Sequence, residues 1–252
     1  MGTIADGKLF VPEGHMYSPP LFHKAQQLAL NLTNGKVVWS IDAFDVTSAP
    51  AISDGVMTTL NAYDNQIYAW GKGPSAMSVT AQSFDSAIVI RGSVIDTSAG
   101  TQQEAQAANF PNGVPCVSDE SMTPFMEAVY MQQPMPTNTT GVPVPLSVLD
   151  SNGNYRQIGS TTSDGSGMFT LTWTPDIPGN YTVVASFAGS ESYYSSYAET
   201  SFFVSAPAPT ASPYPTVSLA STQSYIIGIG IAIIIAIAIG FAITILMLRK
   251  RP

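Results

Sequence analysis

The stretch ALNLTNGKVVWSI, residues 29–41, decides how the first part of this 252-residue chain is interpreted. At its centre stands Asn34-Gly35. An Asn-Gly pair between two β-capable runs is a strong signal for a type I′ turn, because that turn needs positive φ at both central residues. The flanking runs are LAL at 28–30 and VVW at 37–39. The stretch therefore predicts a β-hairpin.

An internal repeat surrounds this hairpin. IADG at residues 4–7 is matched 48 residues later by ISDG at residues 52–55, and QLAL at 27–30 is echoed by QIYAW at 66–70. A period of roughly 40–50 residues with four short strands per unit is typical of a β-propeller. The repeat covers about one and a half blades, so it predicts a partial β-propeller.

The hairpin resembles the blade motif of the PQQ-like repeat family, which is roughly Ala-x-Asp-x-x-Thr-Gly-x-x-x-Trp. Ala29, Gly35 and Trp39 match this motif, whereas Asn31 and Asn34 stand where the family has Asp and Thr. The resemblance implies that Trp39 is structural and packs between blades. In the family's enzymes the cofactor lies on the axis of a complete ring, so one and a half blades imply no bound cofactor.

This resemblance covers residues 1–73 and implies that the chain is the C-terminal part of a longer exported protein. The chain begins MGTIADGKLFV, which has neither a basic segment nor an apolar segment of the kind that signal peptides contain. We therefore expect the remaining blades and an export signal to lie upstream of Met1.

Residues 77–205 have a different pattern, in which short alternating strands are separated by turn residues. Such a pattern is typical of a β-sandwich. Strands are expected over residues 86–96, in a hairpin over 142–159, and over residues 168–175, 180–189 and 198–205.

Residues 169–204 also resemble the Ig-like modules that recur in prokaryotic cell-surface proteins. The resemblance implies that Trp173 lies in the core and that Tyr181 occupies the place of a tyrosine corner, with Val183 where antibody domains have a cysteine. The expected fold class is therefore mainly β, with a partial propeller, an Ig-like sandwich and one transmembrane helix.

Residues 97–141 form an insertion that a minimal Ig domain lacks. Within it, SDESMTPFMEAVYMQQ at 118–133 predicts a short helix, with Thr123 as a cap and Pro124 in its first turn. Two interpretations remain open: the helix covers an open edge of the sandwich, or it docks a partner. Its apolar face is formed by Phe125, Met126 and Val129.

Four thioethers near this helix have the chemistry of Cu(I) ligands, but no His or Cys lies within five residues of them, so no metal is predicted. DSNGN at residues 150–154 begins like a calcium loop, but its glycine is misplaced, and a hairpin turn is favoured. The four thioethers belong to Met122, Met126, Met131 and Met135.

No catalytic residue is predicted in this chain. Cys116 is the only cysteine, and neither histidine is near it in the sequence, which favours a structural thiol. His15 and His23 fall in a propeller loop, where a structural or solvated role is expected. The net charge is −8, and the acidic body argues against a nucleic-acid partner.

The most distinctive segment is residues 225–248, which we predict to be a transmembrane helix. Residues 226–248 contain no charged side chain, and as a helix they would span about 34 Å, against about 30 Å for the bilayer core. The basic tail, residues 249–252, follows directly, so the positive-inside rule places it in the cytoplasm and residues 1–224 outside. Residues 206–224 read as a Pro/Ser/Thr-rich stalk.

Three glycosylation triplets, beginning at Asn31, Asn138 and Asn180, are compatible with this orientation. The Ile-rich anchor, the acidic body and the pairing of modules resemble archaeal surface proteins. The expected function is binding or display at the cell surface, with the lipid bilayer and an extracellular protein or glycan as partners. Two alternatives remain open: a fragment of a quinoprotein-like dehydrogenase whose active site lies in other blades, and a tail-anchored scaffold.

Overall fold

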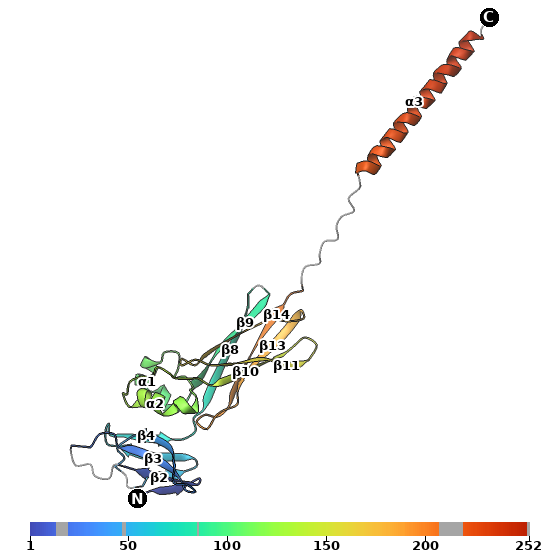
Figure 1. The fold of residues 1–252 in the computed structure, drawn as a ribbon. Helices are drawn as coiled ribbons and strands as arrows, with labels where there is room; N and C mark the ends of the chain where they lie inside the picture. Colours follow the sequence, from blue (N-terminus) through green and yellow to red (C-terminus); the bar gives the residue numbers. More distant parts are fainter. Residues whose placement is uncertain (14–19, 47–48, 85, 207–218, 251–252) are drawn as a thin grey trace. The chain divides into compact units, whose positions relative to one another are not determined.

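The structure is a computed structural model of the chain, and it describes residues 1–13, 20–46, 49–84, 86–206 and 219–250. It confirms the predicted fold class at the level of its layout: the chain is mainly β, with several antiparallel sheets and one C-terminal apolar helix (Figure 1). The chain forms two compact units, Met1–Ala206 and Pro207–Pro252.

Two small antiparallel sheets are formed by the first 70 residues. In each sheet, the strands follow one another in chain order. A propeller blade has four strands, so the first sheet has the strand number of one blade and the second has one strand fewer. The first sheet contains β1 (Thr3–Ala5), β2 (Lys8–Pro12), β3 (Gln26–Asn31) and β4 (Val37–Asp42), and the second contains β5 (Ala51–Ser53), β6 (Val56–Asn61) and β7 (Gln66–Trp70).

The repeated Asp-Gly pairs, and not Asn34-Gly35, form the two-residue turns. Residues 6–7 and residues 54–55 all have positive φ, and each pair joins two directly paired strands, which is the geometry of a type I′ turn. At Asn34-Gly35 only the glycine has positive φ, so the predicted turn type is corrected there. The Asn31 side chain accepts a hydrogen bond from the Thr33 N–H at 2.8 Å, which lengthens the loop between β3 and β4.

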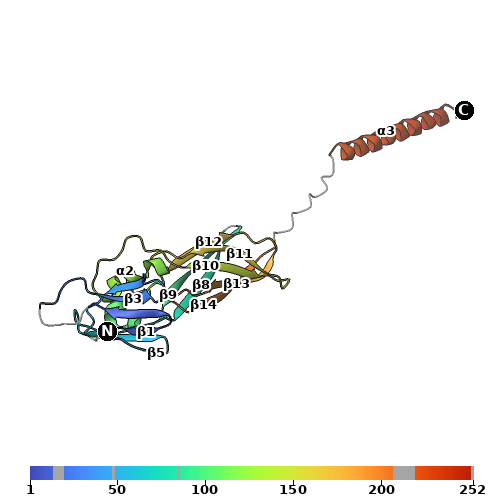
Figure 2. The same ribbon diagram turned by 60° about the horizontal axis from the view of Figure 1, so that its bottom comes forward.

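The two small sheets pack face to face through one face each. The Trp39 and Trp70 rings meet edge to face with centroids 5.7 Å apart, and Ala29 and Met57 are buried in the same contact region of their sheets. The Thr3 hydroxyl donates to the Pro50 carbonyl at 2.6 Å. Figure 2 shows β1 and β5 side by side at one edge of this pair.

Seven strands form the second and larger β region. Four of them make one sheet in the order β11-β10-β13-β14, and three make another in the order β12-β9-β8. The sequence analysis missed β8, which precedes the first predicted strand and pairs with it along its full length. The strands are β8 (Ser75–Phe84), β9 (Ala87–Asp96), β10 (Pro143–Leu149), β11 (Tyr155–Thr162), β12 (Met168–Trp173), β13 (Gly179–Phe187) and β14 (Ser196–Val204).

One apolar core joins these two sheets, because its buried side chains come from both of them. Ile90 and Phe169 come from the three-stranded sheet, and Leu146 and Val183 come from the four-stranded sheet. Tyr181 and Tyr193 are the largest of the fully buried side chains, and Tyr181 stacks on the Phe202 ring at 5.4 Å. Such a core is the main source of stability for a sandwich.

Tyr181 and Trp173 lie at the same end of this core, with their ring centroids 5.3 Å apart. The Tyr181 hydroxyl donates to the Ile177 carbonyl at 3.0 Å, four residues upstream, and it accepts from the Ile177 N–H at 3.3 Å. Trp173 is only half-buried and packs against the core from its rim, under the Arg156 guanidinium.

The insertion contains three short helical segments: η1 (Ala99–Gln102), α1 (Glu104–Asn109) and α2 (Asp119–Tyr130). The predicted start of α2 is corrected, because Ser118 is its N-cap, and Thr123 and Pro124 lie inside the helix. Asp119 and Glu120 occupy the first turn, where carboxylates are favoured by the helix dipole. These two acidic residues explain why the helix begins earlier than the proline suggested.

The apolar face of α2 is turned inward. Phe125 is 1% exposed and Val129 is 6% exposed, in a cluster with Val114 and Val117, and Met126 packs against this cluster and against the sandwich core. The chain itself thus covers two of the three side chains that were candidates for partner docking.

The second unit contains α3 (Leu219–Arg249). A span of 28 residues within it, Thr222–Arg249, is long and apolar enough to cross a membrane, at about 42 Å. The helix begins before the predicted residue 225, so residues 219–224 are helical and do not belong to the stalk. Residues 207–218 of the predicted stalk and residues 251–252 of the tail lie outside the described residues.

The hydroxyl of Tyr181 gives the first testable prediction. Tyr181→Phe removes the hydroxyl that pairs with both backbone groups of Ile177 and leaves the ring in place. We expect a loss of about 1–3 kcal/mol in the free energy of unfolding, because the part-buried backbone groups of Ile177 lose their partner. Urea denaturation of the unit Met1–Ala206 measures this loss. Tyr197→Phe is the control, because that ring is 69% exposed, and it should change stability by less than about 0.5 kcal/mol.

Candidate functional site

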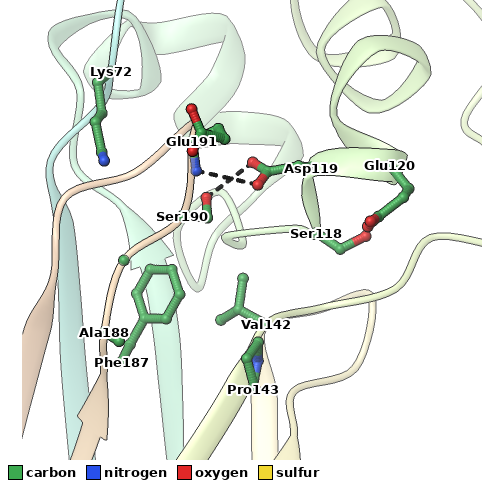
Figure 3. Close-up of a pocket in the computed structure, with 11 residues that line it drawn as sticks. Lys72, Ser118, Asp119, Glu120, Val142, Pro143, Phe187, Ala188, Ser190 and Glu191 are labelled. Atoms are coloured by element: carbon green, nitrogen blue, oxygen red, sulfur yellow. Dashed lines mark hydrogen bonds between the residues drawn. The ribbon is translucent and has the colours of Figure 1, made fainter.

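A cleft of about 530 Å³ lies where three parts of the first unit meet: the segment before β8, the start of α2, and the connection between β13 and β14 (Figure 3). A volume of this size falls in the range of small-molecule and cofactor sites. The lining residues are Lys72, Ser118, Asp119, Glu120, Val142, Pro143, Phe187, Ala188, Gly189, Ser190 and Glu191.

Asp119 is the most heavily hydrogen-bonded group in the cleft. Its Oδ1 accepts from the Ser192 hydroxyl at 2.6 Å, the Ser190 hydroxyl at 2.9 Å and the Ser192 N–H at 3.1 Å. Its Oδ2 accepts from the Glu191 N–H at 3.1 Å. Figure 3 shows this carboxylate turned toward the connection between β13 and β14. The side chain thus fastens that connection to the first residue of α2.

The environment of Asp119 favours its ionised form. Burial on its own would raise the pKa of this carboxyl, but the hydrogen bonds from Ser192, Ser190 and the backbone at Glu191 outweigh burial, and the pKa is lowered below 3.8. Its position in the first turn of α2 acts in the same direction. With four donors on its two oxygens, the carboxylate is suited to holding a loop and poorly suited to abstracting a proton.

The segment that joins the small sheets to the sandwich is fastened to the same connection. The Gly73 N–H donates to the Ser192 carbonyl, and the Gly73 carbonyl accepts from the Tyr194 N–H, both at 2.8 Å. Lys72 extends over the Tyr194 ring at 5.5 Å. Gly189 has φ of +88°, and a Cβ there would lie 2.8 Å from the Tyr193 carbonyl oxygen, so a glycine is required at that turn.

The walls of the cleft combine apolar residues with a few charged side chains. Pro143 supplies exposed apolar surface, whereas Val142 and Phe187 are each only 1% exposed and lie behind the lining; Lys72 and Glu191 supply charge. Among the residues that the structure describes, no three His, Cys, Asp or Glu side chains lie close enough to hold a metal ion together. The cleft thus presents charged groups beside a small apolar surface.

The DSNGN stretch, which begins like a calcium loop, forms a hairpin turn. Asp150 Oδ1 accepts from the N–H groups of Asn152 at 2.9 Å and Asn154 at 3.0 Å, so it caps its own turn. Arg156 pairs with Asp150 at 3.2 Å and also with Asp176. These contacts already occupy the Asp150 carboxylate, which a bound calcium ion would need as a ligand.

The other sequence-level candidates are dispersed through the fold. The Tyr193 hydroxyl donates to the Met122 sulfur at 3.9 Å, whereas Met135 is exposed on a separate part of the insertion. Cys116 is fully buried, and burial, with a contribution from Asp96, raises the pKa of its thiol, so it stays protonated. His15 lies outside the described residues.

The sequence analysis did not find Asp119 or its serine partners. They are separated by about 70 residues, and the contact depends on where the insertion folds onto the sandwich. The only local signal is SDE at 118–120, because a serine followed by two acidic residues is typical of a helix start. No protein-family model matches this chain, and no curated protein matches it.

The hydrogen bonds of Asp119 predict a pH dependence. Because the pKa of this carboxyl is lowered in the folded state, its contribution to stability is complete above its ordinary value of 3.8 and is lost as the pH falls through the folded value. Asp119→Asn removes this titration. We therefore expect the stability of wild-type Met1–Ala206 to fall more steeply than that of the variant below about pH 4.

Urea denaturation at a series of pH values measures this difference. Glu191→Gln is the matched control, because it removes a carboxylate from the same cleft but keeps the Glu191 N–H that Asp119 binds. Amide exchange at Glu191 and Ser192 should be faster in Asp119→Asn than in this control. Equal pH profiles for wild type and Asp119→Asn would show that the carboxylate is not what holds the connection.

Proposed function

We propose that this chain is a membrane-anchored protein that binds or displays at the cell surface through its β-rich unit. The observation that carries the proposal is α3, in which Thr222–Arg249 is long and apolar enough to cross a bilayer. Almost all described side chains of this helix are exposed, so nothing in the described part of the chain covers them. A bilayer provides the apolar surroundings that such a helix needs.

The proposed orientation has the unit Met1–Ala206 outside and the C-terminus in the cytoplasm. Its support is the basic cluster at residues 249–251 after the apolar span, because basic residues are retained on the cytoplasmic side. Tyr225, at the other end of the span, is an aromatic side chain of the kind found at membrane interfaces.

In this proposal the two β regions are modules of different kinds. We assign residues 1–73 to PQQ-like propeller repeats, supported by the matched type I′ turns and the Trp39–Trp70 contact. We assign residues 77–205 to an Ig-like module, supported by seven strands in sheets of three and four and by the hydroxyl of Tyr181, which bonds back to Ile177 as in a tyrosine corner. Both kinds of module serve as binding surfaces or spacers in many proteins.

The cleft beside Asp119 is the proposed contact region for an extracellular protein or glycan. Its small apolar surface and its charged groups lie together, and Asp119 is already occupied with holding the fold. The alternative, a quinoprotein-like dehydrogenase, would depend on residues in other blades, so it stays a prediction.

A protease experiment tests the anchor and its orientation together. Trypsin added to intact cells should degrade the unit Met1–Ala206, which contains lysines at positions 8, 24, 36 and 72 among its cleavage sites. The α3 region should remain in the membrane fraction after alkaline carbonate extraction. Full protection of the unit in intact cells, with degradation only after lysis, would favour the tail-anchored scaffold.

Two variants make this experiment sharper. Removal of Leu219–Arg249 should release the remaining chain from the membrane fraction, because the apolar span is lost. Replacement of Arg249, Lys250 and Arg251 by glutamate should keep membrane association but reduce the fraction of chains in the proposed orientation. A chain without Leu219–Arg249 that remained in the membrane after carbonate extraction would contradict the anchor.

A further inference from the structure

The chain leaves its first unit from one end of the sandwich, which we call the exit end. β14 ends at Val204, opposite the first residue of β13, and the unit ends at Ala206. The hairpin between β10 and β11 turns at this end, because Leu149 pairs with Thr182 near the start of β13. The exit end therefore contains the close of β14 and the β10–β11 turn.

The hairpin between β8 and β9 turns at the exit end as well. β8 and β14 lie in contact and begin together, since the Ser75 and Ser196 hydroxyls are 2.8 Å apart. The two strands have 10 and 9 residues, so they also end together. Figure 1 shows both hairpins near the point where the chain leaves β14, whereas the small sheets and α2 lie at the opposite end of the sandwich.

Four large apolar side chains are exposed around the exit end. Phe84 is 71% exposed, Tyr155 63%, Phe203 62% and Leu149 41%. Phe84 ends β8, Leu149 and Tyr155 flank the β10–β11 turn as a directly opposed pair, and Phe203 is the residue before the last of β14. The four side chains come from both sheets, so they lie around the end of the sandwich and not on one face of it.

The register of the strands keeps these side chains outside. Val148 and Phe202, the strand neighbours of Leu149 and Phe203, pack in the core. Successive side chains of a strand point to opposite faces, so Leu149 and Phe203 point outward as long as the core is formed. Large apolar side chains gathered at one exposed place are typical of an interaction surface.

We infer that the exit end lies on the surface of a lipid bilayer, with these four side chains in its interfacial layer. The inference rests on the proposed anchor, since the bilayer is the one that α3 crosses. The residues between Ala206 and Leu219 span at most about 45 Å even when fully extended. The strands of the sandwich add about 30 Å, so the opposite end is tethered much less closely.

The chemistry of the exit end suits an uncharged lipid surface. Tyrosine is enriched at membrane interfaces, and phenylalanine and leucine insert at the boundary between headgroups and acyl chains. Arg156 pairs with both Asp150 and Asp176 beside the β10–β11 turn, so the described charges there are nearly balanced. We therefore expect a contact that needs no anionic lipid.

Other parts of the first unit do not compete for this surface. The segment before the sandwich joins it at the opposite end, where Gly73 pairs with Ser192 and Tyr194. A contact made by four side chains is weak by itself, but a tether of 12 residues gives it a high effective concentration. Removal of Leu219–Arg249 should therefore still release the chain from the membrane.

Tryptophan fluorescence of the full chain tests this inference. The chain is reconstituted into phosphatidylcholine vesicles with or without bromine on the acyl chains, and emission is compared with that of wild type in the same vesicles. Phe84→Trp and Phe203→Trp each add an indole at the exit end, and the brominated lipid should quench most of the added emission. Both leaflets have the same lipid, so the result does not depend on orientation.

Tyr197→Trp is the matched control. Tyr197 is 69% exposed and lies on the same strand and the same face as Phe203, but six residues, or about 20 Å, further from the exit end. The emission that it adds should not be quenched.

A second pair of variants tests whether the apolar side chains cause the contact. Phe84→Ser in the Phe203→Trp chain should restore most of the quenched emission, because the exit end loses one of its inserted side chains. Tyr197→Ser in the same chain should leave the quenching unchanged. Far-UV circular dichroism checks that each variant keeps the β-rich spectrum of wild type.

Several results would overturn the inference. Unquenched indoles at positions 84 and 203, in chains that float with the vesicles, would remove the lipid contact and leave the anchor intact. Equal quenching at position 197 would mean that a side of the sandwich, and not its end, lies on the lipid. Chains that fail to float would overturn the anchor and this inference together. A glycan on Asn180 of the native protein would also contradict the contact, because Asn180 pairs with Phe203.

Discussion

A sheet of three or four strands has two faces, and it is stable only where at least one face finds an apolar partner. In the sandwich this requirement is met by two sheets of comparable size around one core that includes Ile90, Leu146 and Phe169. In the first 70 residues this requirement for an apolar partner is met less completely. The side chain of Gln27 is fully buried there, and within the described part of the chain neither of its polar atoms has a hydrogen-bond partner. Such a group costs about 1–3 kcal/mol, so the two small sheets hold each other less firmly than the sandwich sheets do.

The insertion, residues 97–141, compensates for part of this weak packing because it contacts both β regions. Phe125 and Val129 build a small core of their own next to the sandwich, and Glu127 reaches the backbone of β4 from the same helix. Asp119, at the start of that helix, holds the connection between β13 and β14, which in turn pairs with Gly73. One helix of 12 residues thus contacts β4, the sandwich core and the connection between β13 and β14. Its covered apolar face is a consequence of this role.

The sequence predicted the elements that depend on local chemistry and missed those that depend on distant contacts. Strand alternation and turn residues were sufficient for β9–β14, and uninterrupted apolar residues were sufficient for α3. The type of turn at Asn34-Gly35 was wrong because the Asn31 side chain competes for the Thr33 N–H. The start of α2 was misplaced because Pro124 is tolerated inside the helix when Ser118 precedes two acidic residues. Asp119 was not identified because its partners are about 70 residues away. The identity of the repeat and sandwich families, the ligand and the orientation stay predictions.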